Sequence, residues 1–326
     1  MAAGGIKTHP GLPGVDHVIS AICTLFENDY HLGLGAWANS LYAHGYRGRI
    51  YAGYRGSLPP WITGAKECDG FTEYTPVEGL TLRFIPLATK LHLTNYKPDF
   101  MLEVWGKHCP QAEALFYFDP DITILCRWAF FEEWVEAGVG VCQDVNGWMA
   151  DNHPIRHAWR KLLQPDGLMF RNRLETYFNG GFVGLLAADR AFLNNWQQVQ
   201  ALMQKCGVDF NVIGFGDRTF PFTCRDQDAL NITCMVTDRK VSPLGQDGMD
   251  FQNGGGGYVM SHAAGGTKPW RKRMLMNILA KGRPPSRADK GFYSFVRHPI
   301  QVFTTASYLL KKTDLLLASA IGRYIQ

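Results

Sequence analysis

Short apolar runs alternate with amphipathic segments along most of the chain. The runs that predict strands span residues 17–26, 49–54, 81–87, 112–118, 122–125, 139–142 and 177–186. The segments with apolar residues at helical spacing span 32–44, 96–107, 128–137, 189–206 and 226–235, the fourth with Asp189 as its cap. Such alternation is typical of a largely parallel sheet with crossover helices. The pattern therefore predicts an α/β fold.

The domain organisation follows from the composition between these elements. No linker rich in Gly, Pro or Ser divides the chain, so we expect one domain over residues 17–275 with a mixed, mostly parallel sheet. Residues 1–16 have Gly and Pro where a signal peptide has its apolar core, and are expected to form a flexible arm. Residues 276–326 are expected to form a basic, helical appendage. A last strand is expected to end at His262, after a Gly-rich loop at 253–257.

The composition excludes several classes of protein. With 46% hydrophobic and 19% charged residues, the 326-residue chain has the apolar side chains for a large core and too few charges for a disordered protein. No run of about 18 apolar residues is present that would span a bilayer. The eight cysteines form no C-x-x-C pair. Their spacing argues against a zinc knuckle or a disulfide framework, and favours reduced, buried thiols in a cytoplasmic protein.

The basic charge is concentrated at the C-terminal end. The net charge is +4, but residues 268–326 hold twelve Lys and Arg against two Asp, a local charge of +10. A helical stripe farther on comprises Val302, Ala306, Leu309, Leu310, Leu316, Leu317, Ala320, Ile321 and Tyr324. This combination predicts either contact of 271–326 with the anionic inner face of the cytoplasmic membrane or a helix packed on the domain. Without a recognised module, the charge does not predict nucleic-acid binding.

Two acidic residues directly follow an apolar run. Asp119 and Asp121 stand at positions i and i+2, so on an extended chain their carboxylates point the same way and can chelate one hard cation. Pro120 disfavours a helical conformation of Asp119, and ligands bind where strands end in open α/β sheets. The alternative is a solvated surface turn.

A second candidate segment, 261–270, has the sequence SHAAGGTKPW. His262 can supply a neutral imidazole as a third metal ligand, because the ordinary pKa of histidine is about 6.5. Lys268 can supply a cation for a phosphate, and the glycines permit a close approach of the backbone. The alternative is a histidine with a structural role only.

Four segments in order carry a family resemblance. They are Glu27-Asn28-Asp29-Tyr30 with Asn39-Ser40-Leu41, the pair Asp119 and Asp121, Asn179-Gly180-Gly181 with residues 226–231, and H-x-x-G-x-x-K-P-W from His262 to Trp270. Together they resemble the family 8 retaining glycosyltransferases of GT-A fold, which include bacterial lipooligosaccharide galactosyl- and glucosyltransferases and glycogenin. The last two segments are specific, whereas D-x-D alone is not.

The resemblance implies a GT-A-type, Rossmann-like nucleotide-sugar-binding domain. It implies that the protein transfers a sugar with retention of configuration. The donor would be a nucleotide-sugar, in the first place a UDP-sugar, and the acceptor a glycolipid, oligosaccharide or polysaccharide. It further implies Mn²⁺ or Mg²⁺ held by Asp119, Asp121 and His262, and the imidazole favours Mn²⁺. The donor-binding residues it implies are Glu27, Asp29, Tyr30, Lys97, Asn179, Gly180, Gly181, Asp228, Gly265 and Lys268.

The resemblance assigns the catalytic roles to two neighbouring residues. Asp226 would hold hydroxyls of the donor sugar, and Gln227 would lie near the anomeric carbon. Because an amide is a poor nucleophile, we expect attack from the face of the leaving group, with the phosphate oxygen taking the acceptor proton. The first segment departs from the family, since Glu27 and Asp29 stand where Asp and Asn are usual. The identity of the base is therefore predicted less firmly than the metal site.

Two further patterns in the sequence are weaker, and two rival functions remain open. His153 and His157 have the i, i+4 spacing of a zinc site, but Asn152 and Pro154 favour a helix start there. The aromatic residues from Trp128 to Trp134 have the spacing of core residues rather than of a sugar-stacking surface. A catalytically silent sugar-nucleotide-binding scaffold on the same fold is the main rival, and a nucleotide-sugar hydrolase is another.

Overall fold

The computed structural model describes residues 19–214, 220–251 and 259–325. The predicted arm at 1–16 and the Gly-rich loop at 253–257 lie outside these ranges. The strands are β1 (Ser20–Glu27), β2 (Gly48–Arg55), β3 (Lys66–Cys68), β4 (Phe71–Val77), β5 (Leu80–Pro86), β6 (Ala114–Phe118), β7 (Ile122–Ile124), β8 (Val139–Trp148), β9 (Thr176–Phe178), β10 (Phe182–Leu186), β11 (Val241–Leu244) and β12 (Met260–His262). The helices are α1 (His31–Ala43), α2 (Lys97–Glu103), α3 (Ala129–Glu136), α4 (Pro154–Leu163), α5 (Ala191–Lys205), α6 (Arg225–Val236), α7 (Met274–Lys281), α8 (Arg287–Ser294) and α9 (Thr305–Ile325).

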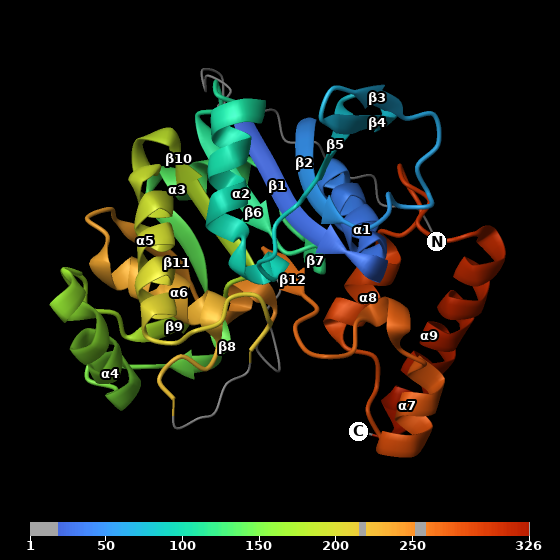
Figure 1. Ribbon diagram of the computed structural model, residues 1–326. Coiled ribbons are helices and arrows are strands. Elements are labelled where there is room, and N and C mark those ends of the chain that lie inside the picture. Colours follow the sequence, from blue (N-terminus) through green and yellow to red (C-terminus); the bar gives the residue numbers. More distant parts are fainter. Residues whose placement is uncertain (1–18, 215–219, 252–258, 326) are drawn as a thin grey trace.

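The main sheet has the order β11-β8-β10-β6-β1-β2-β5-β4-β3 (Figure 1). Its centre, β6-β1-β2-β5, is parallel, and antiparallel strands flank it. The predicted α/β fold with a mixed sheet and a helical C-terminal region is confirmed. The chain moves from β1 outward through β2 and β5, then returns to the other side of β1 as β6. Such a reversal leaves a crevice at the carboxyl ends of β1 and β6.

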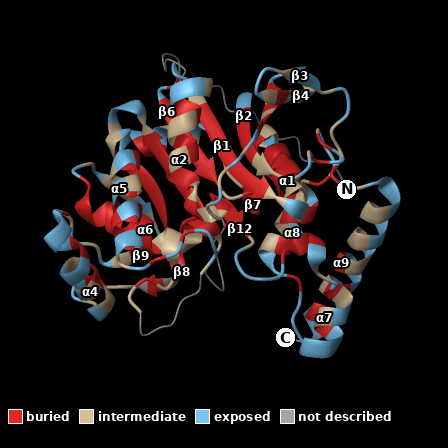
Figure 2. Ribbon diagram, viewed as in Figure 1, coloured by how far each residue is buried: buried red, intermediate tan, exposed pale blue. Residues whose placement is uncertain are grey.

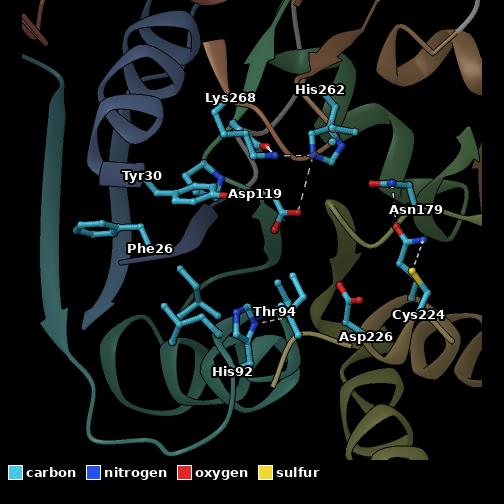
Figure 3. Close-up of a pocket in the computed structure, with 18 of the residues that line it drawn as sticks. Phe26, Tyr30, His92, Thr94, Asp119, Asn179, Cys224, Asp226, His262 and Lys268 are labelled. Carbon is cyan, nitrogen blue, oxygen red and sulfur yellow. Dashed lines mark hydrogen bonds and ion pairs between the residues drawn. The ribbon is translucent and has the colours of Figure 1, made fainter. Parts of the chain in front are cut away.

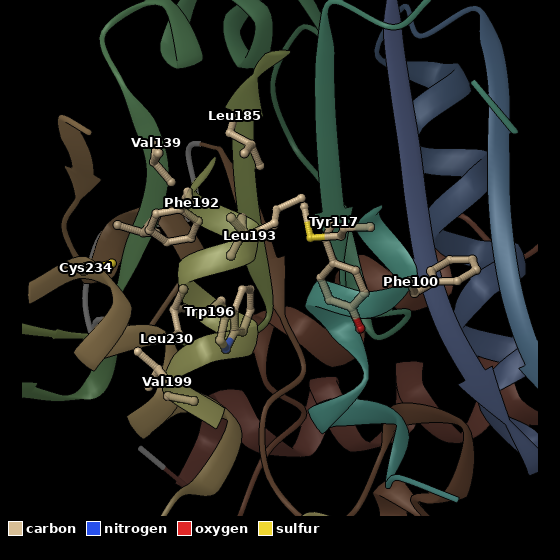
Figure 4. Packing of buried hydrophobic residues seen from close by; sticks show 14 of the residues in the cluster. Phe100, Tyr117, Val139, Leu185, Phe192, Leu193, Trp196, Val199, Leu230 and Cys234 are labelled. Carbon is tan, nitrogen blue, oxygen red and sulfur yellow. The ribbon is translucent and has the colours of Figure 1, made fainter. Parts of the chain in front are cut away.

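Hydrophobic cores cover both faces of the sheet, and β1 contributes to both. Cys23 and Leu25 face the core that contains α2, α5 and α6, whereas Ile22 and Phe26 face the core that contains α1 and α3. Figure 4 shows the first core, where Trp196 of α5 packs among aliphatic side chains. In Figure 2 the buried residues, drawn in red, are concentrated in the central strands of the sheet. The sheet is therefore the layer that both cores share.

Several predicted boundaries were wrong. The single strand expected over 177–186 is two strands, β9 and β10, separated by Asn179-Gly180-Gly181. The helix expected over 96–107 ends at Glu103 and continues as one π-helical turn. Asp189 does not cap α5, because it lies in a short 3-10 helix and Arg190 takes the cap position.

Residues after 275 pack into the same core as α1. Phe292, Val296 and Ile300 are buried there, and the buried Asn39 side chain of α1 donates to the carbonyls of Phe295 and Ile300. Asn39 therefore holds the C-terminal segment on the body. Among the described residues, no helix has both the length and the apolar character needed to cross a membrane.

Candidate active site

A pocket of about 690 Å³ opens at the carboxyl ends of β1 and β6 (Figure 3). Its size is typical of small-ligand sites. The wall includes Glu27 and Tyr30 after β1, residues 92–94, the 119–121 turn after β6, and the 262–268 loop. The beginning of α6 forms the opposite side. The pocket thus lies where the order of the strands predicts a ligand site.

The turn after β6 presents two carboxylates. The Asp119 backbone N–H donates to the Gly181 carbonyl at 2.7 Å, which ties the turn to the loop between β9 and β10. Tyr117 lies two residues earlier, on the same face of the strand, and its hydroxyl donates to Asp119 Oδ1 at 2.8 Å. Asp121 is buried, and β7 begins directly after it. The contacts of this turn with Tyr117 and Gly181 therefore help to fix the direction of its carboxylates.

Strand register places His262 beside these acids. β12 pairs antiparallel with β7, and His262 lies opposite Ile122. Its Nε2 is 3.3 Å from Asp121 Oδ1 and 4.0 Å from Asp119 Oδ2. The three ligand atoms lie within 4.8 Å of one another, close to the separation of about 4.2 Å that two ligands of one ion can reach. In the described part of the chain, no other such trio comes together.

The donor set fits a divalent cation. Two carboxylate oxygens and an imidazole nitrogen converge on one point, where the two acids repel each other. The buried Nδ1 of His262 has no hydrogen-bond partner among the described residues, so no side chain fixes the ring from behind. A cation between the three groups would remove the repulsion and orient the ring.

Lys268 lies on the other side of Asp121. Its Nζ donates to Asp121 Oδ2 at 2.6 Å and to the Ala263 carbonyl at 3.0 Å. Burial alone would raise the pKa of Asp121, but the charges and hydrogen bonds of His262 and Lys268 outweigh it, so the pKa of Asp121 lies well below its usual range. Asp121 is therefore ionised at neutral pH, as a metal ligand must be.

Lys97 connects the three candidate metal ligands to α6. Its side chain is fully buried, and its Nζ is 3.2 Å from Asp119 Oδ1 and 3.3 Å from Asp226 Oδ2. Burial opposes the charged form, but the two carboxylates outweigh it and raise the pKa of Lys97. The ammonium also donates to the Gly180 carbonyl at 2.7 Å. Lys97 lies behind the pocket wall and holds Asp119 and Asp226 in place.

A network of amides fixes Gln227. Its Oε1 accepts from Asn179 Nδ2 at 2.9 Å and from the Gly180 backbone N–H at 3.1 Å. Asn179 Nδ2 also donates to Asp144 Oδ2 at 2.7 Å, and its Oδ1 accepts from the Gly181 N–H at 2.8 Å. The 179–181 bend thus binds the acids after β6 on one side and the start of α6 on the other.

The first segment makes ion pairs of its own. Glu27 pairs with Arg55 at 2.7 Å and still lines the pocket. Asp29 accepts from Trp270 Nε1 at 3.0 Å and from Arg271 Nε at 2.6 Å. The hydrogen bond from Arg271 is the largest cause that lowers the pKa of Asp29. Both acids therefore connect β1 to other segments, and Asp29 lies outside the pocket wall.

The structure brings together two thirds of the predicted site. The predicted residues that line the pocket are Glu27, Tyr30, Asp119, Asp121, Asn179, Asp226, Gln227, His262, Gly265 and Lys268. Those that lie behind or beside it are Asp29, Lys97, Gly180, Gly181 and Asp228. Asp228 is buried and accepts from Tyr177 and from the Cys224 backbone.

Part of the pocket wall was not predicted from the sequence. Tyr117 had a signal, because it stands two residues before Asp119 on a strand. Asp144 was missed because β8 was expected to end at 142. The pair His92 and Thr94 belongs to a short 3-10 helix, Leu93–Asn95, which His92 caps and which is too short to leave a pattern in the sequence. His153 caps α4, and His157 is exposed, so they contribute to no described metal cluster.

Comparisons with known proteins support the fold. No protein-family model matches the chain, and no curated protein matches it. Among 212 matching chains of solved structures is that of WbbM, a bifunctional glycosyltransferase in its apo form, with a TM-score of 0.53 and 13% sequence identity. The match covers 94% of this chain and 53% of the WbbM chain, so this chain spans about half its neighbour's length. At that identity the likeness is one of fold: the α/β architecture of this chain is similar to that of a known glycosyltransferase.

Proposed function

We propose that the chain is a metal-dependent glycosyltransferase that uses a nucleoside diphosphate sugar. The observation that carries the proposal is the convergence of Asp119, Asp121 and His262 beside Lys268, at one end of a pocket whose other end holds Asp226 and Gln227. The similarity to the WbbM fold supports it. The donor would be a UDP-sugar and the acceptor a glycolipid, an oligosaccharide or a polysaccharide.

The two ends of the pocket have different tasks. A divalent cation, when bound by the three ligands, supplies positive charge for the leaving diphosphate, and Mn²⁺ is our choice because of the imidazole. Lys268, which is buried and cationic beside Asp121, supplies a second positive charge at the same place. For the base of the nucleotide, Tyr30 offers a ring on which it can stack, and Glu27 offers a carboxylate.

The other end of the pocket favours a mechanism without a covalent intermediate. Asp226 is ion-paired with Lys97, which makes its carboxylate a poorer nucleophile, and the Gln227 amide is a weak one. We therefore assign Asp226 to the sugar hydroxyls and Gln227 Oε1, held by two donors, to developing positive charge near the anomeric carbon. Attack from the face of the leaving group retains the configuration.

The test is thermal unfolding with UDP, GDP, ADP, CMP and TDP, each with Mn²⁺ and with EDTA. A ligand at 100 times its Kd stabilises the native state by about 2.7 kcal/mol, which raises the melting temperature by about 5 °C. We expect one nucleotide to do so with Mn²⁺ only. The shift should vanish in Asp121→Asn and persist in the control Asp238→Ala, which removes an exposed acid elsewhere.

The outcomes separate the proposal from its rivals. No shift with any nucleotide would remove the basis for a nucleotide-sugar enzyme. A Mn²⁺-dependent shift without transfer to any of a panel of carbohydrate acceptors would favour the scaffold. Release of the nucleoside diphosphate with water as the sole acceptor would favour the hydrolase.

A further inference from the structure

Helix α9 has two apolar faces, and only one packs on the molecule. Leu315, Ala318 and Gly322 face inward and are buried. At Gly322 the backbone approaches Pro284 and Ile278 so closely that a Cβ would lie 2.8 Å from one and 3.3 Å from the other. Most of the stripe predicted from the sequence faces the opposite way, but Val302 lies before α9 and is buried, and Ile321 is half-buried against the core. Figure 2 shows α9 at the edge of the molecule with exposed residues along its outer side.

The outer face carries no charge and, apart from the exposed Thr313 at its centre, is apolar. Leu309, Leu310, Leu316, Leu317 and Tyr324 are 57%, 74%, 57%, 49% and 90% exposed, and at 100° per residue they share one side of the helix with Ala320. Helix α7, which packs against α9, adds the exposed Met276 and Leu279. These two helices hold more than half of the large apolar side chains that are exposed in the described part of the chain.

Positive charge borders one side of this face. Both acids of the region are engaged, since Asp289 pairs with Lys272 and Asp314 accepts from the backbone N–H groups at the start of α7. The exposed cations of the C-terminal region are Arg271, Arg273, Lys281, Arg283, Arg287, Lys290, Arg297 and Arg323, of which Arg271 and Arg287 pair with Asp29 and Asp250. By helical geometry, Lys312 and Arg323 border the outer face of α9 along one side. An apolar strip beside unneutralised cations is complementary to an apolar layer covered by anions.

We propose that the outer face of α9, with α7, docks on an anionic lipid bilayer. The helix would lie in the plane of the interface, its leucines among the acyl chains and the bordering cations at the phosphates. A second copy of the chain fits less well, because a two-fold interface would bring the same cations face to face. The docking face lies outside the pocket. It is nevertheless connected to the pocket loop, because Lys311 on α9 donates to the Trp270 carbonyl at 2.8 Å. Trp270 stands two positions after the pocket residue Lys268.

The experiment is co-sedimentation of the full chain with vesicles of phosphatidylcholine, alone or mixed with phosphatidylglycerol. We expect binding to the mixed vesicles that weakens as salt is raised. Leu310→Glu combined with Leu317→Glu should reduce vesicle binding at least about tenfold, because two side chains that would lie among the acyl chains become charged. The matched control is Leu162→Glu with Met169→Glu, two exposed apolar residues at or near α4, which lies at the opposite edge in Figure 1.

Three results would overturn the proposal. One is an absence of binding of the unmodified chain to the mixed vesicles. The second is equal loss in the outer-face and control variants. The third is a dimer, seen by analytical ultracentrifugation, that the outer-face variant dissociates without a change in vesicle binding. Thermal unfolding of each variant checks the fold, and the nucleotide shifts described above are measured in the absence of lipid, so failure of this proposal leaves the proposed function untouched.

Discussion

At the scale of the residue, the site rests on a buried cation. Lys97 is fully enclosed and pairs with both Asp119, in the turn after β6, and Asp226, at the start of α6. A buried charge that loses its partner is costly, whereas an exposed ion pair contributes little. The geometry of both acids therefore depends on a side chain that does not itself line the pocket.

Replacing Lys97 tests this dependence. Lys97→Met leaves two carboxylates without their shared cation, so we expect a loss of about 3 kcal/mol in the free energy of unfolding, measured in urea. The control, Lys107→Met, removes an exposed lysine from a surface pair with Glu103 and should change it by less than about 0.5 kcal/mol. Equal effects would show that the bridge contributes nothing beyond a surface pair.

Asp228 gives stability a pH dependence of known sign. Burial raises the pKa of Asp228 to about 7, so between its ordinary value and 7 the native state holds a proton that the unfolded chain has lost. This contribution is present at low pH and is lost as the pH rises through 7, at about 1.4 kcal/mol per unit in that range. Asp228→Asn cannot titrate, so its stability relative to wild type should improve from about pH 5 to about pH 8 in urea unfolding. Parallel curves would contradict this.

Which residues could be predicted depends on how local their signal is. Asp119, Asp121, His262 and Lys268 stand in short motifs, and the structure brings these four together. Asp29 was expected to bind the donor, and its role remains untested, but its partner Arg271 lies 242 residues away in the chain. No local pattern contains such a contact.

At the scale of the element, the bend between β9 and β10 holds the site together. The apolar residues on both sides of Asn179-Gly180-Gly181 resemble one continuous strand, which is why the break was missed. A Cβ at Gly181 would lie 2.6 Å from His262 Cε1. The absence of a side chain there is therefore what admits the imidazole to the acids.

Gly181→Ala should displace His262 and weaken the metal site. We expect at least about a tenfold loss in Mn²⁺ affinity, measured by calorimetric titration. Gly266→Ala is the matched control, because a Cβ at that position meets nothing within 4 Å. Equal Mn²⁺ affinities of the two variants would mean that the ring does not depend on this space.

Two of the elements that escaped prediction, β3 and β4, have weak periodicity. β3 and β4 form a short hairpin at the sheet edge, with charged and polar residues among the apolar ones. The central strands β1, β2, β5 and β6 contain runs of buried residues and were found. A buried strand needs a recognisable run or alternation of apolar residues, whereas an exposed edge strand does not.

At the scale of the whole molecule, the two cores share their strands, which predicts a single unfolding transition. Trp37 in α1 and Trp196 in α5 are fully buried on opposite faces of the sheet. We expect Trp37→Ala and Trp196→Ala each to cost about 3–5 kcal/mol, with fluorescence and circular dichroism changing together in urea. A second transition in either variant would show that the cores unfold separately.

The pairing of β12 with β7 has a consequence for how the protein is made. Lys268 and Asp121 are 147 residues apart in the chain, and His262 reaches the acids through the same late strand. During synthesis, the sheet centre emerges from the ribosome long before the third ligand does. A nascent chain that holds both aspartates therefore lacks the third of the three candidate ligands until residue 262 has been translated, so on the proposed function metal capture would be a late event that requires a nearly finished fold.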